Sequence, residues 1–122
     1  MLRLSLLFAV LLLASGCSAV AEVPDWVGEV EYVIDGDTII VDSLHIRLVD
    51  IDAPELGTPW GEDALWFMHA LVYGEVVELF CDGVDVYDRW LCRVEVGGSD
   101  VGGRMVGAGH AAVWVDLVEG RL

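Results

Sequence analysis

Hydrophobic and polar residues alternate along much of the chain after residue 29, in short runs bounded by turn-forming residues. Alternation with a period of two residues is the pattern of a β-strand with one buried face. The pattern predicts five strands, at residues 30–34, 38–41, 44–49, 76–80 and 91–96. Between the first two lies an Asp-Gly pair, Asp35-Gly36, which favours a tight turn with positive φ. Residues 82–88 join the last two strands as a hairpin loop.

One longer apolar stretch breaks this alternation and predicts a helix. Thr58 is suited to the N-cap and Pro59 to the first helical position, and residues 64–72 are apolar apart from one His. Gly74 ends this helix, and residues 100–108 predict a short second helix that contains three glycines. Three strands, a helix, two strands and a short helix favour a mainly β (α+β) fold, a five-stranded closed barrel of the OB type.

The beginning of the chain has the pattern of an export signal. Arg3 precedes an apolar run over residues 4–13, which is shorter than the roughly 20 residues that a membrane span needs. Small residues then precede Cys17, and this resembles the lipobox of bacterial or archaeal lipoproteins, in which the Cys becomes the lipid-bearing N-terminus. The alternative is ordinary signal cleavage nearby, with Cys17 a bystander.

These features define the expected organisation of the chain. Residues 1–16 are predicted to be a signal peptide of the lipoprotein type, residues 17–28 a tether, and residues 29–122 a single domain. We expect an exported monomer, either a cell-surface or periplasmic lipoprotein held to the membrane through a lipid on Cys17, or a secreted protein.

The charge of the chain is strongly negative. Acidic residues number 21 and basic residues 6, all of them Arg, so the formal net charge is −15. This balance argues against a protein that binds nucleic acid through a general basic surface. Carboxylate-rich surfaces stay soluble in concentrated salt, where the Debye length is only about 3 Å at 1 M. A high-salt habitat and a GC-rich genome in which Arg displaces Lys both explain the composition.

Carboxylates gather at the ends of the predicted strands. Asp37 sits at the start of the second strand, directly before residue 38, and Asp50, Asp52 and Glu55 follow the third strand, in a turn that Pro54 stiffens. Hard oxygen donors in such a cluster suit Ca²⁺, which binds carboxylates, carbonyls and water. We expect Asp50 to be solvated rather than a ligand.

Two arginines accompany these carboxylates. Strand alternation directs Arg47 away from the core, and Arg89 lies in the predicted hairpin. Two guanidinium groups and a metal ion neutralise charge on a phosphate, and a carboxylate base activates a water for in-line attack. This combination is what hydrolysis of a phosphodiester requires.

The segments that carry these residues resemble the three signature segments of the staphylococcal-nuclease-like (thermonuclease) family. They are Ile34-Asp35-Gly36-Asp37-Thr38-Ile39, the run from Ile46 to Glu55, and Asp85-Val86-Tyr87-Asp88-Arg89-Trp90-Leu91. They occur in the family's order, and the resemblance extends from about residue 30 to residue 115. The motifs DGDT and IRL followed by DxPE are specific, whereas DxYxRxL is looser.

The resemblance implies an OB-type barrel that hydrolyses DNA and RNA with Ca²⁺. By position in the motifs, Asp37 and Asp52 would be the metal carboxylates, and the backbone carbonyl of Ala53 would be a third ligand. Glu55 would reach the metal through water and act as the candidate general base.

The same resemblance assigns the phosphate contacts. Arg47 and Arg89 would bind the scissile phosphate and its transition state. The family usually has Gly where this chain has Asp88, and a carboxylate there would either weaken phosphate binding or orient the guanidinium fork. Tyr87 and Trp114 are the candidate substrate contacts.

Cys81 and Cys92 lie on consecutive predicted strands, on either side of one hairpin. Outside the cytoplasm such a pair is expected to form a disulfide. The loop that it closes is short, so the entropic stabilisation is ~3 kcal/mol or less. The alternative is two buried thiols.

The sequence therefore predicts a Ca²⁺-dependent nuclease that acts on DNA or RNA outside the cytoplasm. The alternative from another class is a non-catalytic OB-type binding module of a surface lipoprotein, because OB barrels often bind without chemistry. The acidity, which opposes binding of a polyanion, favours that alternative, and the retained metal and catalytic positions oppose it. The sequence stops at Leu122, where the best-known members continue, so we expect the family's C-terminal helix to be lacking.

Overall fold

The computed structural model describes residues 21–114 of the chain. The predicted signal peptide, the lipid-bearing Cys17 and the expected lack of a C-terminal helix concern segments that lie outside the described residues. None of the helices within residues 21–114 has the length and apolar character that a membrane crossing requires.

Five strands form a closed barrel, which confirms the predicted mainly β, OB-type fold. Neighbouring strands pair antiparallel in the order β3-β2-β1-β5-β6, and a parallel pairing of β3 with β6 closes the barrel. In this closing pair Arg47 is the register partner of Leu91, and Leu48 is the partner of Cys92. The bounds are β1 Trp26–Asp35, β2 Thr38–Val41, β3 Leu44–Leu48, β5 Val76–Val84 and β6 Trp90–Val96.

Three strands of two residues lie outside the barrel. β7 (Ser99–Asp100) extends the sheet beyond β6, and β4 (Ile51–Asp52) pairs with β8 (Ala112–Val113) in a small second sheet. The sequence does not predict them, because two residues are too few to show alternation. β4 nevertheless matters for the position of Asp52, because Asp52 belongs to this strand and pairs with Ala112 of β8.

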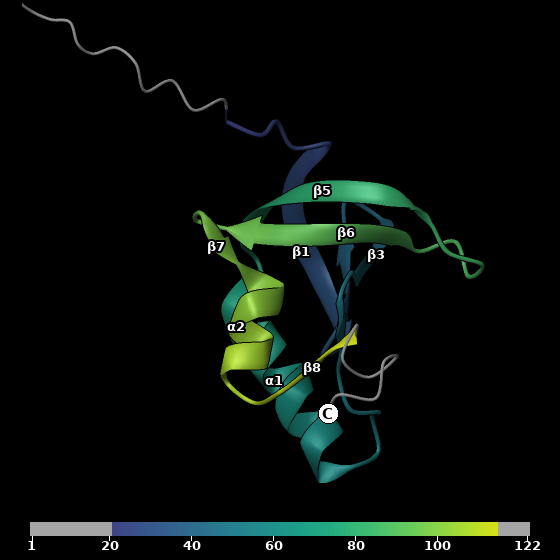
Figure 1. Ribbon diagram of the computed structural model, residues 1–122, viewed down its shortest axis with the longest axis vertical. Helices are drawn as coiled ribbons and strands as arrows, with labels where there is room; N and C mark the ends of the chain where they lie inside the picture. Colours follow the sequence, from purple (N-terminus) through teal and green to yellow (C-terminus); the bar gives the residue numbers. More distant parts are fainter. Residues whose placement is uncertain (1–20, 115–122) are drawn as a thin grey trace, which may run out of the picture.

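Both predicted helices are present, and the barrel's hairpin between β5 and β6 projects away from α2 (Figure 1). Helix α1 (Pro59–Val72) begins as predicted, with the Thr58 hydroxyl accepting a hydrogen bond of 3.0 Å from the backbone N–H of Gly61. Helix α2 (Val101–Gly107) is capped in the same way by Asp100.

The core is built from the inward faces of the strands and from one face of each helix. Alternate side chains of β3, β5 and β6 are buried, as expected for a barrel interior, and in β2 Thr38, Ile39 and Val41 are all buried. The largest fully buried side chains are Ile39, Ile46, Leu48, Met68, Leu79 and Met105.

The first strand is longer than predicted. β1 begins at Trp26, so residues 26–28, which the sequence places in a tether, pair with Leu79, Glu78 and Val77 of β5. The side chains of Trp26 and Val27 are exposed, so no buried face marks this end of the strand in the sequence. Backbone hydrogen bonds to β5 hold it instead.

Gly36 is required for space and not for its φ angle. The expectation of a positive φ at this turn is wrong, because Gly36 is absent from the residues with positive φ. A Cβ at Gly36 would lie 2.7 Å from Cβ of Ala53 and 2.8 Å from Cβ of Ala64. The turn between β1 and β2 therefore packs closely against both α1 and the loop that carries Ala53.

Candidate functional site

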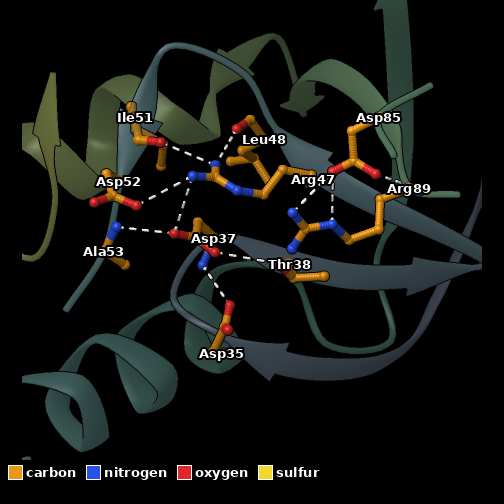
Figure 2. Close-up of polar contacts among 10 residues, drawn as sticks. All are labelled: Asp35, Asp37, Thr38, Arg47, Leu48, Ile51, Asp52, Ala53, Asp85 and Arg89. Atoms are coloured by element: carbon orange, nitrogen blue, oxygen red, sulfur yellow. Dashed lines mark hydrogen bonds and ion pairs between the residues drawn. The ribbon is translucent and has the colours of Figure 1, made fainter. Parts of the chain in front are cut away.

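Arg47 lies in a pocket of oxygen atoms at the end of β3 (Figure 2). Its Nη1 donates hydrogen bonds to the backbone carbonyls of Leu48 and Ile51, the latter at 2.9 Å. Its Nη2 lies 3.2 Å from Oδ1 of Asp52 and 3.5 Å from Oδ2 of Asp37. The side chain points away from the barrel core, as alternation predicts, but only 15% of it is exposed. The turn from residue 49 to residue 52 and two carboxylates cover it.

Asp37 is a nearly buried carboxylate, with 10% of its side chain exposed. Oδ2 accepts a hydrogen bond of 2.9 Å from the backbone N–H of Ala53, and Oδ1 accepts one of 3.1 Å from the Thr38 hydroxyl. The backbone N–H of Asp37 donates to Oδ1 of Asp35 at 3.0 Å. Burial, together with the neighbouring Asp37, raises the pKa of Asp35 to about 6.

The oxygen donors around Arg47 fit a hard divalent cation. Asp37 and Asp52 share one guanidinium, so two carboxylates face a single positive charge. Carboxylate and backbone carbonyl oxygens are the donors that Ca²⁺ prefers, with water completing its coordination. Within residues 21–114, no three His, Cys, Asp or Glu side chains are close enough to hold a metal ion by themselves. A cation here would therefore depend on backbone oxygen and water as well as on the two aspartates.

Arg89 is held by Asp85 within the hairpin loop (Figure 2). Nε and Nη2 of Arg89 each lie 2.8 Å from Oδ2 of Asp85. Oδ1 accepts hydrogen bonds from the backbone N–H groups of Tyr87, at 2.8 Å, and Arg89, at 3.0 Å. Desolvation raises the pKa of Asp85, but these hydrogen bonds and the charge of Arg89 outweigh it and hold that pKa below its usual value.

Asp88 occupies a position that favours glycine. Its φ is 63°, in the left-handed region that side chains other than Gly, Asn and Asp rarely adopt. Its backbone N–H donates to the carbonyl of Asp85 at 3.1 Å, and its side chain is exposed. The carboxylate that orients the fork of Arg89 is that of Asp85, three positions before the Asp88 that the sequence suggested.

Arg47 and Arg89 line one cleft of about 370 Å³. Leu91 and Trp114 also line it, and Trp114 is 48% exposed, with its backbone N–H bonded to the carbonyl of Asp50 at 2.8 Å. Pairing of β3 with β6 brings the two arginines together, because Leu91 is the register partner of Arg47. The two predicted phosphate contacts therefore converge on a single gap.

Tyr87 lies beside the guanidinium of Arg89. The guanidinium carbon of Arg89 is 5.3 Å from the centroid of the Tyr87 ring, a cation–π arrangement. Tyr87 is 75% exposed, so it is open to solvent beside Arg89. Tyr87 and Trp114 thus lie close to the arginines, where the sequence predicts substrate contacts.

Glu55 is exposed and does not line the cleft. Its backbone is tightly placed: its carbonyl accepts a hydrogen bond of 2.8 Å from the Thr58 hydroxyl. A Cβ on Gly61 would lie only 1.9 Å from that carbonyl oxygen. The first turn of α1 therefore fixes the loop of Glu55, and the assignment of Glu55 as general base stays a prediction.

Residues 45–120 match the protein family described as "Staphylococcal nuclease homologue". The chain belongs to the staphylococcal nuclease family. The match spans β3, β4, both helices, β5 and β6, and it includes Arg47, Asp52, Glu55 and Arg89.

Curated relatives align with most of the chain. Micrococcal nuclease of Shigella flexneri is 36% identical over 94 residues, which is 71% of this chain and 54% of that protein. An uncharacterized endonuclease of Escherichia coli O157:H7 is 42% identical over 93 residues, which is 72% of this chain and 60% of that protein. Protein ParB of Escherichia coli is 40% identical over 103 residues, covering 79% and 54% of the two chains. The chain thus spans little more than half the length of these relatives.

Three residues that shape the candidate site were given no role in the sequence analysis. Asp85 orients Arg89, Thr38 donates to Asp37, and Gly61 admits the backbone of Glu55. The spacing of Asp85 and Arg89, four residues apart in one polar loop, is a signal from which their pairing could have been predicted. Thr38 and Gly61 have no such signal, because their contacts depend on how distant segments pack.

A disulfide joins Cys81 in β5 to Cys92 in β6, at directly opposed positions of the two strands. The cysteines lie at the base of the hairpin that contains Asp85 and Arg89. The alternative of two buried thiols does not describe this structure.

Proposed function

We propose that this protein is a Ca²⁺-dependent nuclease that hydrolyses phosphodiester bonds of DNA or RNA outside the cytoplasm. The observation that carries the proposal is the convergence of Arg47 and Arg89 on one cleft, with Arg47 also bound to the carboxylates of Asp37 and Asp52. Family membership supports it, since relatives are named micrococcal nuclease and endonuclease.

Each arginine keeps a donor for a phosphate oxygen. Among the contacts of the described residues, Arg47 uses Nη1 and Nη2, and Arg89 uses Nε and Nη2. Nε of Arg47 and Nη1 of Arg89 therefore remain for a substrate. Charge-assisted hydrogen bonds from two guanidinium groups stabilise the additional negative charge of the pentacoordinate phosphate.

Asp37, Asp52 and the backbone carbonyl of Ala53 would hold Ca²⁺. When bound, the ion would supply positive charge that offsets the carboxylates and the phosphate. Asp37 is prepared for this role, because hydrogen bonds from Ala53 and Thr38 fix its carboxylate. Carboxylates already pair with both arginines, Asp37 and Asp52 with Arg47 and Asp85 with Arg89, so phosphate binding should be weak without a cation.

Glu55 is the proposed general base. Its carboxylate takes a proton from a water molecule, the water oxygen bonds to phosphorus, and the ester bond on the opposite side breaks. Its exposure leaves room for the side chain to turn toward a bound substrate. In the absence of substrate, catalytic hydrogen bonds are often not yet formed.

The first residues of the sequence support the proposed place of action. An apolar run after Arg3 and small residues before Cys17 support export and lipid attachment. We propose that the protein acts as a monomer at a cell surface, in a periplasm or after secretion.

The test is degradation of circular and linear DNA, and of RNA, with Ca²⁺ or with a chelator, from low to molar salt. We expect cleavage only with Ca²⁺, and loss of at least about 100-fold in rate for Arg47→Ala and Arg89→Ala. Arg104→Ala is the matched control, because Arg104 is exposed on α2 and, among the described residues, its side chain hydrogen-bonds to Ser99 and lines no part of the cleft. Equal rates for all three variants, or cleavage that persists in chelator, would refute the proposal.

A non-catalytic OB-type binding module is the second candidate. The net charge of −15 favours it, because neutralisation of phosphates supplies most nonspecific affinity for nucleic acid. Retention of a labelled oligonucleotide in Ca²⁺ without any cleavage, at every salt concentration tested, would support this candidate over the nuclease.

A further inference from the structure

The disulfide lies where it can control the position of Arg89. Cys81 and Cys92 are directly opposed in the β5–β6 pairing, and Cys92 is also the register partner of Leu48 in the pairing that closes the barrel. The cross-link therefore ties β5 to β6 at the level where β6 meets β3. Arg89 lies only three residues before Cys92 in the chain.

Beyond the disulfide, the hairpin is held by the pairing of Val84 with Trp90 and by hydrogen bonds within its own loop. The register of β5 with β6 shifts between Cys81 and Val84, and Gly83 has a φ of 87°. No side chain from residue 82 to residue 89 is buried, and Val86 is 91% exposed. A segment with so few buried contacts opens locally more easily than the sheet that carries it. Within the described residues, the disulfide is thus the cross-link that lies next to the segment of Arg89.

A small reductant has a path to this disulfide. Cys92 is fully buried, but Cys81 is half-buried and lines a cleft of about 240 Å³ that Trp26 and Trp90 also line. A thiolate of a dithiol attacks Sγ of Cys81, the S–S bond breaks, and Cys92 leaves as a thiolate that takes a proton. The second thiol of the reagent then releases Cys81, so the protein gains two electrons and two protons and the dithiol becomes a cyclic disulfide.

We infer that the Cys81–Cys92 disulfide is a positioning element for Arg89, and that it makes the activity of the site sensitive to redox state. This inference rests on the proposed nuclease function. Reduction frees the hairpin, so Arg89 and its partner Asp85 spend less time facing Arg47 across the cleft. The metal carboxylates lie on other elements and keep their contacts. A misplacement of about 1 Å costs on the order of 100-fold in rate when groups must converge on one reacting centre.

The experiment uses the full chain with Cys17→Ser, so that a single cysteine pair is present. Cleavage of a short oligonucleotide in Ca²⁺ is compared for the oxidised protein and for the protein reduced with dithiothreitol, below the unfolding temperature of both. We expect reduction to lower kcat by about tenfold or more and to leave the Ca²⁺ affinity, measured by calorimetry, unchanged. An unchanged kcat in the reduced and folded protein would overturn the inference.

Two variants separate positioning from a general loss of stability. Arg89→Ala has no guanidinium to position, so reduction should leave its residual rate unchanged. Glu55→Gln retains Arg89, so reduction should lower its residual rate by the same factor as in the parent protein. Equal losses in both variants would mean that the disulfide acts on stability alone, and the inference would fail.

NMR tests the positioning without any catalysis. The Nε–H signal of Arg89, assigned with Arg89→Ala, should exchange slowly with water in the oxidised protein because Nε donates to Asp85. Reduction should speed this exchange and increase backbone motion in residues 82–89, with residues 44–48 unchanged. Identical spectra would overturn the inference. If the oxidised protein cleaves no nucleic acid, the proposed function fails, and these spectra still decide whether the disulfide orders the hairpin.

Discussion

Asp85 holds Arg89 by two guanidinium nitrogens at once, since Nε and Nη2 both lie 2.8 Å from the same carboxylate oxygen. The second oxygen of Asp85 accepts two backbone hydrogen bonds of the loop. One carboxylate therefore shapes the turn and sets the direction of the guanidinium. This arrangement leaves Nη1 of Arg89 to meet a phosphate.

Asp85→Asn should lower kcat/KM by about 10- to 100-fold. The amide keeps the shape of the side chain but loses the charge-assisted pair that orients Arg89. Steady-state cleavage of an oligonucleotide in Ca²⁺ measures the effect. Asp82→Asn is the control, because Asp82 is exposed in the same hairpin and the change in net charge is identical. Equal effects of the two substitutions would contradict the role of Asp85.

Substitutions of Asp88 should separate backbone strain from charge. Asp88→Gly and Asp88→Asn both remove a negative charge beside Arg89, so both should raise the affinity for a labelled oligonucleotide. Only Gly adopts the left-handed conformation without a Cβ penalty, so it should raise the free energy of unfolding, by up to ~1 kcal/mol. Fluorescence anisotropy in a Glu55→Gln background and urea denaturation measure the two effects. A loss of affinity in both variants would show that Asp88 supports substrate binding.

Gly61→Ala should displace the loop that carries Glu55. The added Cβ would meet the Glu55 carbonyl oxygen at 1.9 Å, so the backbone must shift, at a cost of roughly 1–3 kcal/mol in unfolding free energy. Gly107→Ala is the matched control, because a Cβ there meets no atom within 4 Å and Ala favours a helix by about 0.5–1 kcal/mol. Thermal unfolding and cleavage assays should show loss for the first and none for the second. Full activity in Gly61→Ala would contradict tight placement of this loop.

In the metal-free protein, the contribution of Asp35 to the free energy of unfolding should fall as the pH rises, which is the opposite of the usual effect of an aspartate. Burial raises the pKa of Asp35 in the folded state to about 6, from its ordinary value of 3.8. Between about pH 4 and pH 6 the unfolded chain therefore loses this proton first, and the contribution of Asp35 to stability falls as the pH rises. Asp35→Asn should be more stable than the parent at pH 7 and equal to it below pH 4. A difference that does not vary with pH in chelator would contradict this.

Most of the fold was predictable because its signals are local. Thr58 and Pro59 begin α1 through their own backbone preferences, and alternation marks the five strands of the barrel. The start of β1 at Trp26 was not predictable, since hydrogen bonds from β5 hold residues whose side chains are exposed. Gly36 illustrates the same limit, because the need for glycine arises from Ala53 and Ala64, which are distant in sequence.

The candidate site, like the fold, was predictable only in part. Motif resemblance pointed to Arg47, Asp37 and Asp52, and these side chains do lie together. Resemblance gave no role to Asp85, because a carboxylate that binds Arg89 inside the protein is not a ligand or a base. The neighbouring Asp88 is more conspicuous in the sequence, as a departure from the usual Gly, yet it has the lesser part in orienting the guanidinium.

The parallel pairing of β3 with β6 has a consequence for the chain before it has folded. Arg47 and Arg89 come from different hairpins, 42 positions apart in the sequence, and only this pairing brings them to a shared gap. Contacts between such distant segments form late, because the chain must first lose the entropy of a large loop. Under the proposed function, a chain in which this pairing has not formed would not yet bring both arginines to one phosphate and would not cleave nucleic acid.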